Sequence, residues 1–254
     1  MRELVNGSID WDDRLWRYIS VARFLDMLNQ RTLHFASANQ FEDQFEGAVF
    51  VEPVDEGDLS PMGFVDHAFF ELKRLTKISC WHRRDYESDA MWRLYGAENK
   101  GVAICSTPER MRAALKPFRL APEFGIEDLW AGPVEYVDLT RQPLTDPGML
   151  ERFFKKHRAF EWEQEFRLAI SLRMAEEFGV RVPVCGISVD VDLDVLVDRV
   201  VLGPSVSGAQ CLELHEPLQR AGLSKRLQRS TLFGRPRYVT VPAAGSSGPP
   251  TSKT

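Results

Sequence analysis

The sequence has few of the features that mark a membrane, secreted or disulfide-stapled protein. No apolar run approaches the roughly 20 residues that a membrane span needs, and the opening MRELVNGSIDWDD has no apolar signal-peptide core. The four cysteines, Cys80, Cys105, Cys185 and Cys211, lie far apart and form neither CxxC spacing nor a disulfide framework. These absences predict a cytoplasmic protein whose cysteines are buried free thiols.

Several common catalytic and binding motifs are also missing. The five histidines form neither HxH nor HExxH, no serine stands in a GxSxG elbow, and no glycine-rich phosphate loop follows a strand. Zinc chemistry and serine hydrolysis are therefore unsupported. A net charge of −5 argues against general affinity for duplex nucleic acid, although SKRLQRSTLFGRPRYV (224–239) is locally basic.

The sequence does contain enough apolar residues to form one large core. The chain has 254 residues, of which 44% are hydrophobic, including 16 Phe and 6 Trp. Helical and strand patterns mix without a regular β-α-β repeat, which favours the α+β class over a doubly wound sheet. We expect one compact domain over residues 1–241, with mixed or antiparallel sheets flanked by helices, and a disordered Gly/Ser/Pro tail over 242–254.

Local patterns predict the individual elements. Helical spacing and capping residues predict helices at 21–30 and 64–75, one after the N-cap Ser88, one opening at Pro108 and one over 207–222 that Pro217 interrupts. Apolar runs predict strands at 32–37, 76–81, 101–106, 132–137, 182–189 and 197–203. PGMLERFFKKHRAF (147–160) is predicted to be a helix that leads into the next segment.

That next segment, FEWEQEFRLAI (160–170), has unusual charge alternation. If it is extended throughout, one face is apolar and the other carries three glutamates and an arginine. The apolar set is Trp162, Phe166, Leu168 and Ile170; the charged set is Glu161, Glu163, Glu165 and Arg167. Like charges on one strand face repel unless something screens them. The pattern predicts either a functional site or an open sheet edge. If Glu165 and Arg167 simply pair, they form a solvated strand face.

The loop FEDQFEG (41–47) is the second acidic feature. Phe41 and Phe45 are expected to be buried, with Glu42 and Asp43 facing a cleft. Together with Glu46, these acids could supply oxygen ligands to Mg²⁺ or Ca²⁺, although the spacing matches no EF-hand loop. Alternatively, Asp43 only closes an Asx turn between the two aromatic residues.

Five blocks of sequence, in order, resemble a known bacterial family. LWRYIS, LHFASANQFEDQFEG, ISCW, MWRLYGAENKGVAI and WEQEFRLAI look like successive blocks of domain-of-unknown-function family 2971, over about Leu15 to Gly203. The chain departs from the family's Phe-Asn-Asp-Pro-Phe-Glu block at Glu42 and Gln44, which makes the loop more acidic and less rigid. The family name carries no activity.

A weaker resemblance is to the Arg-Ser-Glu type of ADP-ribosyltransferase. The matching positions are Arg17, Ser79, Glu163 and Glu165. The resemblance implies an ADP-ribosyltransferase-like fold, NAD as substrate and a role as an effector or defence toxin. Glu165 would stabilise the oxocarbenium charge on the ribose, Glu163 would activate the acceptor, and Arg17 would hold the pyrophosphate. Cys80 and Trp81 follow Ser79, where a Ser-Thr-Ser run is usual.

The proposed NAD site makes a geometric prediction. Glu163 and Glu165 should share a cleft with Arg17 and Ser79. Aromatic residues could stack on nicotinamide or adenine there: Tyr18, Trp81 and Trp92. The acceptor, protein or nucleic acid, is left open.

Two other functions remain open. One is a metal-dependent nuclease or phosphoesterase that uses Asp43, Glu46, Glu163 and Glu165 around divalent ions. The other is a non-catalytic module in which the acidic face and the basic C-terminal strand recognise a partner.

Overall fold

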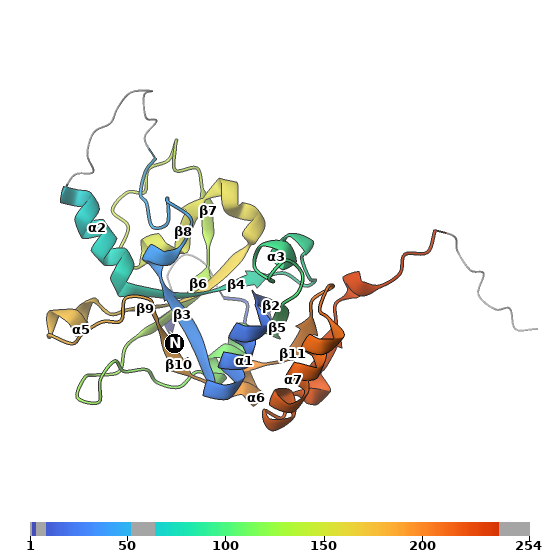
Figure 1. Ribbon diagram of the computed structural model, residues 1–254. Helices are drawn as coiled ribbons and strands as arrows, with labels where there is room; N and C mark the ends of the chain where they lie inside the picture. The colour runs from blue at the N-terminus through green and yellow to red at the C-terminus, as the bar shows by residue number, and fades with distance from the viewer. Residues whose placement is uncertain (1, 4–8, 52–63, 239–254) are drawn as a thin grey trace, which may run out of the picture.

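Most of the described strands lie side by side in one large mixed sheet, with helices around it (Figure 1). The computed structural model describes residues 2–3, 9–51 and 64–238. Within that part of the chain, ten strands join the large sheet and two form a small separate one. No described helix has the length and apolar character to cross a membrane. The tail predicted over 242–254 lies outside the described residues.

The large sheet runs in the order β1-β6-β9-β4-β2-β5-β11-β12, and β3 and β10 branch from β4. Its pairs are antiparallel except β1 with β6 and β11 with β12. Its strands are β1 (Arg2–Glu3), β2 (Leu15–Ile19), β3 (Thr32–Ser37), β4 (Thr76–Arg83), β5 (Val102–Ser106), β6 (Leu129–Pro133), β9 (Glu165–Ser171), β10 (Gly186–Asp190), β11 (Arg199–Leu202) and β12 (Leu227–Arg229). This arrangement confirms the α+β class.

The small sheet pairs β7 (Glu135–Val137) with β8 (Lys155–His157) in parallel. The α-helices are α1 (Val21–Gln30), α2 (Phe64–Leu75), α3 (Asp89–Leu94), α4 (Pro108–Ala114), α5 (Arg173–Glu177), α6 (Leu193–Leu196) and α7 (Gly208–Arg220). Short 3-10 helices are η1 (Ala38–Gln40), η2 (Glu151–Phe154), η3 (Arg158–Glu163), η4 (Ser224–Arg226) and η5 (Thr231–Phe233). Ser88 caps α3 and Pro108 opens α4, as predicted.

Strand β9 is central, because it pairs with β4 on one side and β6 on the other. Its register with β4 sets which side chains share a face. Glu165 lies opposite His82 and Arg167 opposite Cys80, so these four side chains point to one face. Phe166 and Leu168 point to the other face, into the main apolar core. An open sheet edge therefore does not explain the charges of this segment.

The segment before β9 is not the predicted helix and strand. Residues 151–163 form η2, β8 and η3, because Lys155–His157 pairs with β7 instead of continuing a helix. Gln164 then adopts a left-handed conformation, with φ of 43°, which ends η3. Glu163 thus belongs to η3, and Trp162, expected on the apolar face, is 43% exposed. The prediction of continuous alternation from residue 160 was wrong.

Three smaller predictions also need correction. Of the four cysteines, Cys105 is buried while Cys185 is exposed and the other two are intermediate. Helix α7 continues through Pro217. The predicted strand 132–137 is divided between β6 and β7, which belong to different sheets.

Replacing Phe166 by alanine should destabilise the core. Phe166 is 1% exposed and belongs to the main apolar cluster. The loss of its ring leaves a cavity, so we expect the free energy of unfolding to fall by about 3–5 kcal/mol in urea titrations. Phe70→Ala, on the exposed side of α2, should change it by less than about 0.5 kcal/mol. Equal effects of the two substitutions would contradict the assignment of faces.

Candidate functional site

A buried arginine ties together three segments on the charged face of β9. The Arg167 guanidinium donates to both carboxylate oxygens of Glu46, at 2.6 and 2.9 Å, and to those of Glu165, at 2.7 and 3.1 Å. It also donates to the carbonyl oxygen of Phe153 at 2.6 Å. Burial alone would lower the pKa of Arg167. The carboxylates of Glu165 and Glu46 have the larger effect and hold that pKa well above its usual value.

A buried lysine extends the network to the loop and to η3. The Lys156 ammonium donates to Glu165 Oε1 at 2.8 Å and to Glu163 Oε2, and it lies 4.0 Å from Asp43 Oδ2. Its side chain is 7% exposed, as is that of Glu165. We call Asp43, Glu46, Lys156, Glu163, Glu165 and Arg167 the charge cluster. It has four carboxyl groups and two cations.

The two glutamates predicted to be catalytic, Glu163 and Glu165, have different environments within the cluster. Burial raises the pKa of Glu163 to about 7, and its hydrogen bond with Glu165 acts in the same direction. Burial would also raise the pKa of Glu165, but Arg167 and Lys156 hold it well below its usual value. Glu163 is thus the group that exchanges a proton near neutral pH, while Glu165 stays ionised.

Two tyrosines form hydrogen bonds with this pair of glutamates. The hydroxyl of Tyr95, at the end of α3, donates to Glu163 Oε1 at 2.9 Å. The hydroxyl of Tyr136, on β7, accepts the backbone N–H of Glu165 at 2.8 Å. Tyr95 is partly exposed to solvent, whereas Glu163 and Glu165 are both buried.

The structure brings together the four acids of the metal hypothesis but also fills the space between them. Lys156 and Arg167 supply the positive charge that a divalent ion would supply. Among the described residues, no group of three or more His, Cys, Asp or Glu is placed to hold a metal ion. In the loop, Asp43 Oδ1 accepts the N–H of Phe45 at 2.9 Å, which is the predicted Asx turn. Phe41 and Phe45 are half-buried rather than buried, and Glu42 is exposed.

Three other residues predicted for the NAD site, Arg17, Ser79 and Trp81, lie on the opposite face of the sheet. Arg17 donates to Ser79 Oγ at 2.6 Å and to the carbonyl oxygen of His34 at 2.9 Å. Trp81 donates to the same Ser79 hydroxyl at 3.1 Å. In the β4–β9 register, Ser79 and Trp81 alternate with the residues that face Glu165. The predicted common cleft of Glu163 and Glu165 with Arg17 and Ser79 was therefore wrong, because the sheet separates them.

The remaining aromatic candidates are covered by protein. Tyr18 and Trp92 make an edge-to-face contact with ring centroids 4.8 Å apart, and both are buried. The Tyr18 hydroxyl accepts the N–H of Ser88 at 2.9 Å, and Trp92 donates to Glu87 at 2.8 Å. Trp81 is also buried in the main core. These contacts account for the three rings as core residues.

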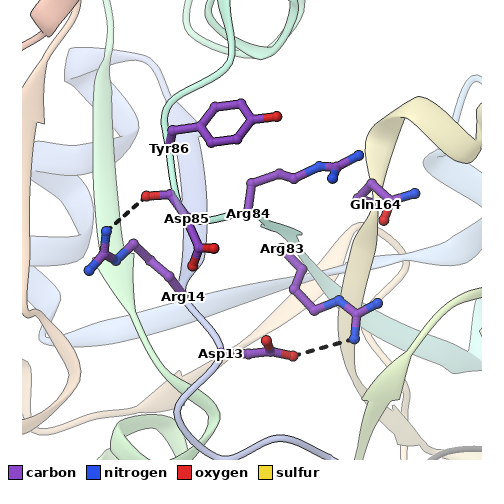
Figure 2. A pocket seen from close by; sticks show the side chains of 7 residues that line it. All are labelled: Asp13, Arg14, Arg83, Arg84, Asp85, Tyr86 and Gln164. Carbon is purple, nitrogen blue, oxygen red and sulfur yellow. Dashed lines mark hydrogen bonds and ion pairs between the residues drawn. The ribbon is translucent and has the colours of Figure 1, made fainter.

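A hollow of about 220 Å³ lies where β4 ends (Figure 2). Its lining residues are Asp13, Arg14, Arg83, Arg84, Asp85, Tyr86 and Gln164. Arg14 donates to the carbonyl oxygen of Asp85 at 2.8 Å, and Arg83 pairs with Asp13 at 3.3 Å. Arg84 is exposed, forms no ion pair with another described residue, and its guanidinium points toward Gln164 (Figure 2). The hollow therefore offers a free cation to an anionic ligand.

One residue, Gln164, connects the hollow to the glutamate pair. Gln164 lines the hollow and lies between Glu163 and Glu165 in sequence. The N–H of Arg83 donates to the Gln164 carbonyl at 2.8 Å, and His82 Nδ1 is 2.6 Å from the Glu163 carbonyl. These arginines were not predicted as site residues, although HRRDY (82–86), a pair of arginines directly after an apolar strand, was a visible signal. Lys156 was not predicted either, because the surrounding residues resembled a helix.

No protein-family model matches the chain, and neither a curated protein nor a solved structure is significantly similar to it.

Replacing Arg167 by methionine should be costly because it leaves two buried carboxylates without their main cation. We expect the free energy of unfolding to fall by about 3–5 kcal/mol, measured by urea titration at pH 7. Adding Glu46→Gln to Arg167→Met removes one of those charges and should recover part of the loss.

Arg93→Met is the matched control, since Arg93 makes an exposed ion pair with Asp89. Its effect should be no more than about 1 kcal/mol. A loss in Arg167→Met as small as in the control would show that the charge cluster does not hold the fold together.

Proposed function

We propose that the protein is an NAD-using enzyme of ADP-ribosyltransferase type, as the weaker sequence resemblance implies. One observation carries the proposal: Glu163, with a pKa of about 7, and the ionised Glu165 flank a residue that lines an arginine-rich hollow. A proton acceptor, a fixed negative charge and a phosphate-binding cation are the groups that transfer from NAD requires. Membership of family 2971, which the sequence blocks resemble, is part of the same proposal.

The hollow supports binding of the phosphate part of NAD. Three arginines line it against two aspartates, and Arg84 is free to form bidentate hydrogen bonds with a phosphate. The exposed ring of Tyr86 offers a surface for stacking a base. Ligand pockets are usually about 300–1,000 Å³, so a hollow of about 220 Å³ accommodates part of a dinucleotide and leaves the rest on the surface. Arg14 and Arg84 thus take the role that the resemblance assigned to Arg17.

The chemistry proposed for Glu163 is proton acceptance. The bond between the ribose C1′ and the nicotinamide nitrogen breaks, and its electron pair leaves with neutral nicotinamide. The oxygen of water or of an acceptor hydroxyl bonds to C1′, and its proton passes to the Glu163 carboxylate. Glu165 contributes its negative charge and orients Glu163 through Lys156, which bonds both carboxylates.

A second candidate, a non-catalytic binding module, has its own supporting observation. Lys156 and Arg167 already bind both oxygens of Glu165, and the carboxyl groups of the cluster are nearly covered. In that case the hollow would bind an anionic ligand, and the cluster would serve only the fold. This candidate predicts binding of NAD or another phosphate compound without turnover.

Glu163→Gln should separate the two candidates. Glutamine keeps the shape, its carbonyl oxygen can still accept the hydrogen bond of Lys156, and its NH2 group can donate to the Tyr95 hydroxyl, but it cannot take a proton. We expect nicotinamide release from NAD to fall by at least about 100-fold while the melting temperature stays within a few degrees of wild type. Because the ionised form is the acceptor, wild-type turnover at saturating NAD should rise with pH and level off above about 7.

Glu161→Gln is the matched control, since Glu161 is exposed and two residues away, and it should leave turnover unchanged. Glu165→Gln is a poor test of chemistry, because it removes the buried partner of Arg167 and should lower stability. If wild type binds NAD in a thermal-shift assay but releases no nicotinamide at any pH, the binding-module candidate replaces the enzyme.

A further inference from the structure

The described C-terminal segment, residues 224–238, is positively charged throughout. It contains five cationic side chains and no acid: Lys225, Arg226, Arg229, Arg235 and Arg237. Arg226 is occupied, because it donates to the carbonyl oxygen of Asp194 at 2.8 Å. Arg235 and Arg237 are exposed and form no ion pair with another described residue. The segment therefore presents unpaired positive charge on a protein whose net charge is −5.

One half-buried glutamate fixes the start of η5 to the body of the protein. The Glu87 carboxylate accepts the hydroxyl of Ser230 at 2.6 Å and both the hydroxyl and the N–H of Thr231, the latter at 2.6 Å. It also accepts the indole N–H of Trp92 at 2.8 Å. Burial would raise the pKa of Glu87, but these hydrogen bonds together keep it below its usual value. The segment is thus held at neutral pH by Ser230 and Thr231, where η5 begins.

Two exposed aromatic side chains lie among the arginines of this segment. Phe233 is 55% exposed, and the Arg229 guanidinium lies 4.8 Å from its ring centroid. Tyr238 is 91% exposed. Figure 1 shows the red C-terminal end of the described chain leaving the body of the protein. Exposed rings next to unpaired guanidinium groups are costly to leave in water and suit a ligand with both planar and anionic groups.

We propose that residues 229–238 bind single-stranded nucleic acid. Arg235 and Arg237 contact phosphates, and Phe233 and Tyr238 stack on unpaired bases. A duplex hides its bases, so it offers these rings no partner and is bound less well. An acidic peptide would satisfy the arginines but leave the rings exposed. The surface is separate from the NAD chemistry proposed above and does not depend on it.

The test is fluorescence anisotropy of the full chain with labelled single strands of about 12 nucleotides, DNA and RNA in separate arms. The double variant Arg235→Ala/Arg237→Ala should bind at least about tenfold more weakly at about 50 mM salt. Its plot of log K against log salt should also be shallower by about 1.4, because two phosphate contacts are lost. Phe233→Ala should weaken binding at least about fivefold without changing that slope.

Arg141→Ala/Arg181→Ala removes the same charge from two exposed arginines elsewhere and should have less effect. Competition by unlabelled duplex, poly-glutamate or anionic phospholipid vesicles should be weaker than by the single strand. Equal competition by duplex or poly-glutamate, stronger competition by vesicles, or equal losses in the two double variants would each overturn the proposal. So would the absence of measurable binding to either single strand. None of these results requires NAD, so they leave the proposed enzyme activity to its own test.

Discussion

The bidentate pairing of Arg167 with Glu46 and Glu165 is the interaction on which the rest of the site depends. All three side chains are almost wholly buried, and the same guanidinium binds the carbonyl of Phe153. A buried ion pair of this kind is expensive to desolvate and adds stability only when its hydrogen bonds are complete. Here they fasten the loop after η1 and the end of η2 onto the central strand β9.

That pairing leaves one carboxylate charge in excess, which the Lys156 ammonium balances. Burial raises the pKa of Glu163 to about 7, its hydrogen bond with Glu165 acts in the same direction, and Glu165 stays ionised. Gln164 takes a left-handed conformation between them, which turns the chain toward the hollow. Glu163, Gln164 and Glu165 thus combine structural and functional roles. The proposed enzyme would use Glu163 for proton transfer, because Glu165 is held by the buried Arg167.

Much of the fold could be predicted from local patterns, whereas the site could not. The helix Val21–Gln30 and the strand Thr32–Ser37 follow from apolar spacing and match the structure. Alternation predicted correctly that Glu165 and Arg167 share a face, but not that this face is buried. Strand register decides that Arg17 lies on the other face, and register depends on pairing between distant segments. Lys156 was missed for the same reason, because its position depends on the pairing of β8 with β7.

The account rests on burial inside the charge cluster, which raises the pKa of Glu163 to about 7. Carbon-13 NMR of protein labelled at the glutamate side-chain carboxyl carbons tests it most directly. One resonance, absent from the spectrum of Glu163→Gln, should titrate with a midpoint of about 7. A Glu163 resonance that titrates near its ordinary value of 4.5 would contradict the account, since the cluster would then leave its proton affinity unchanged.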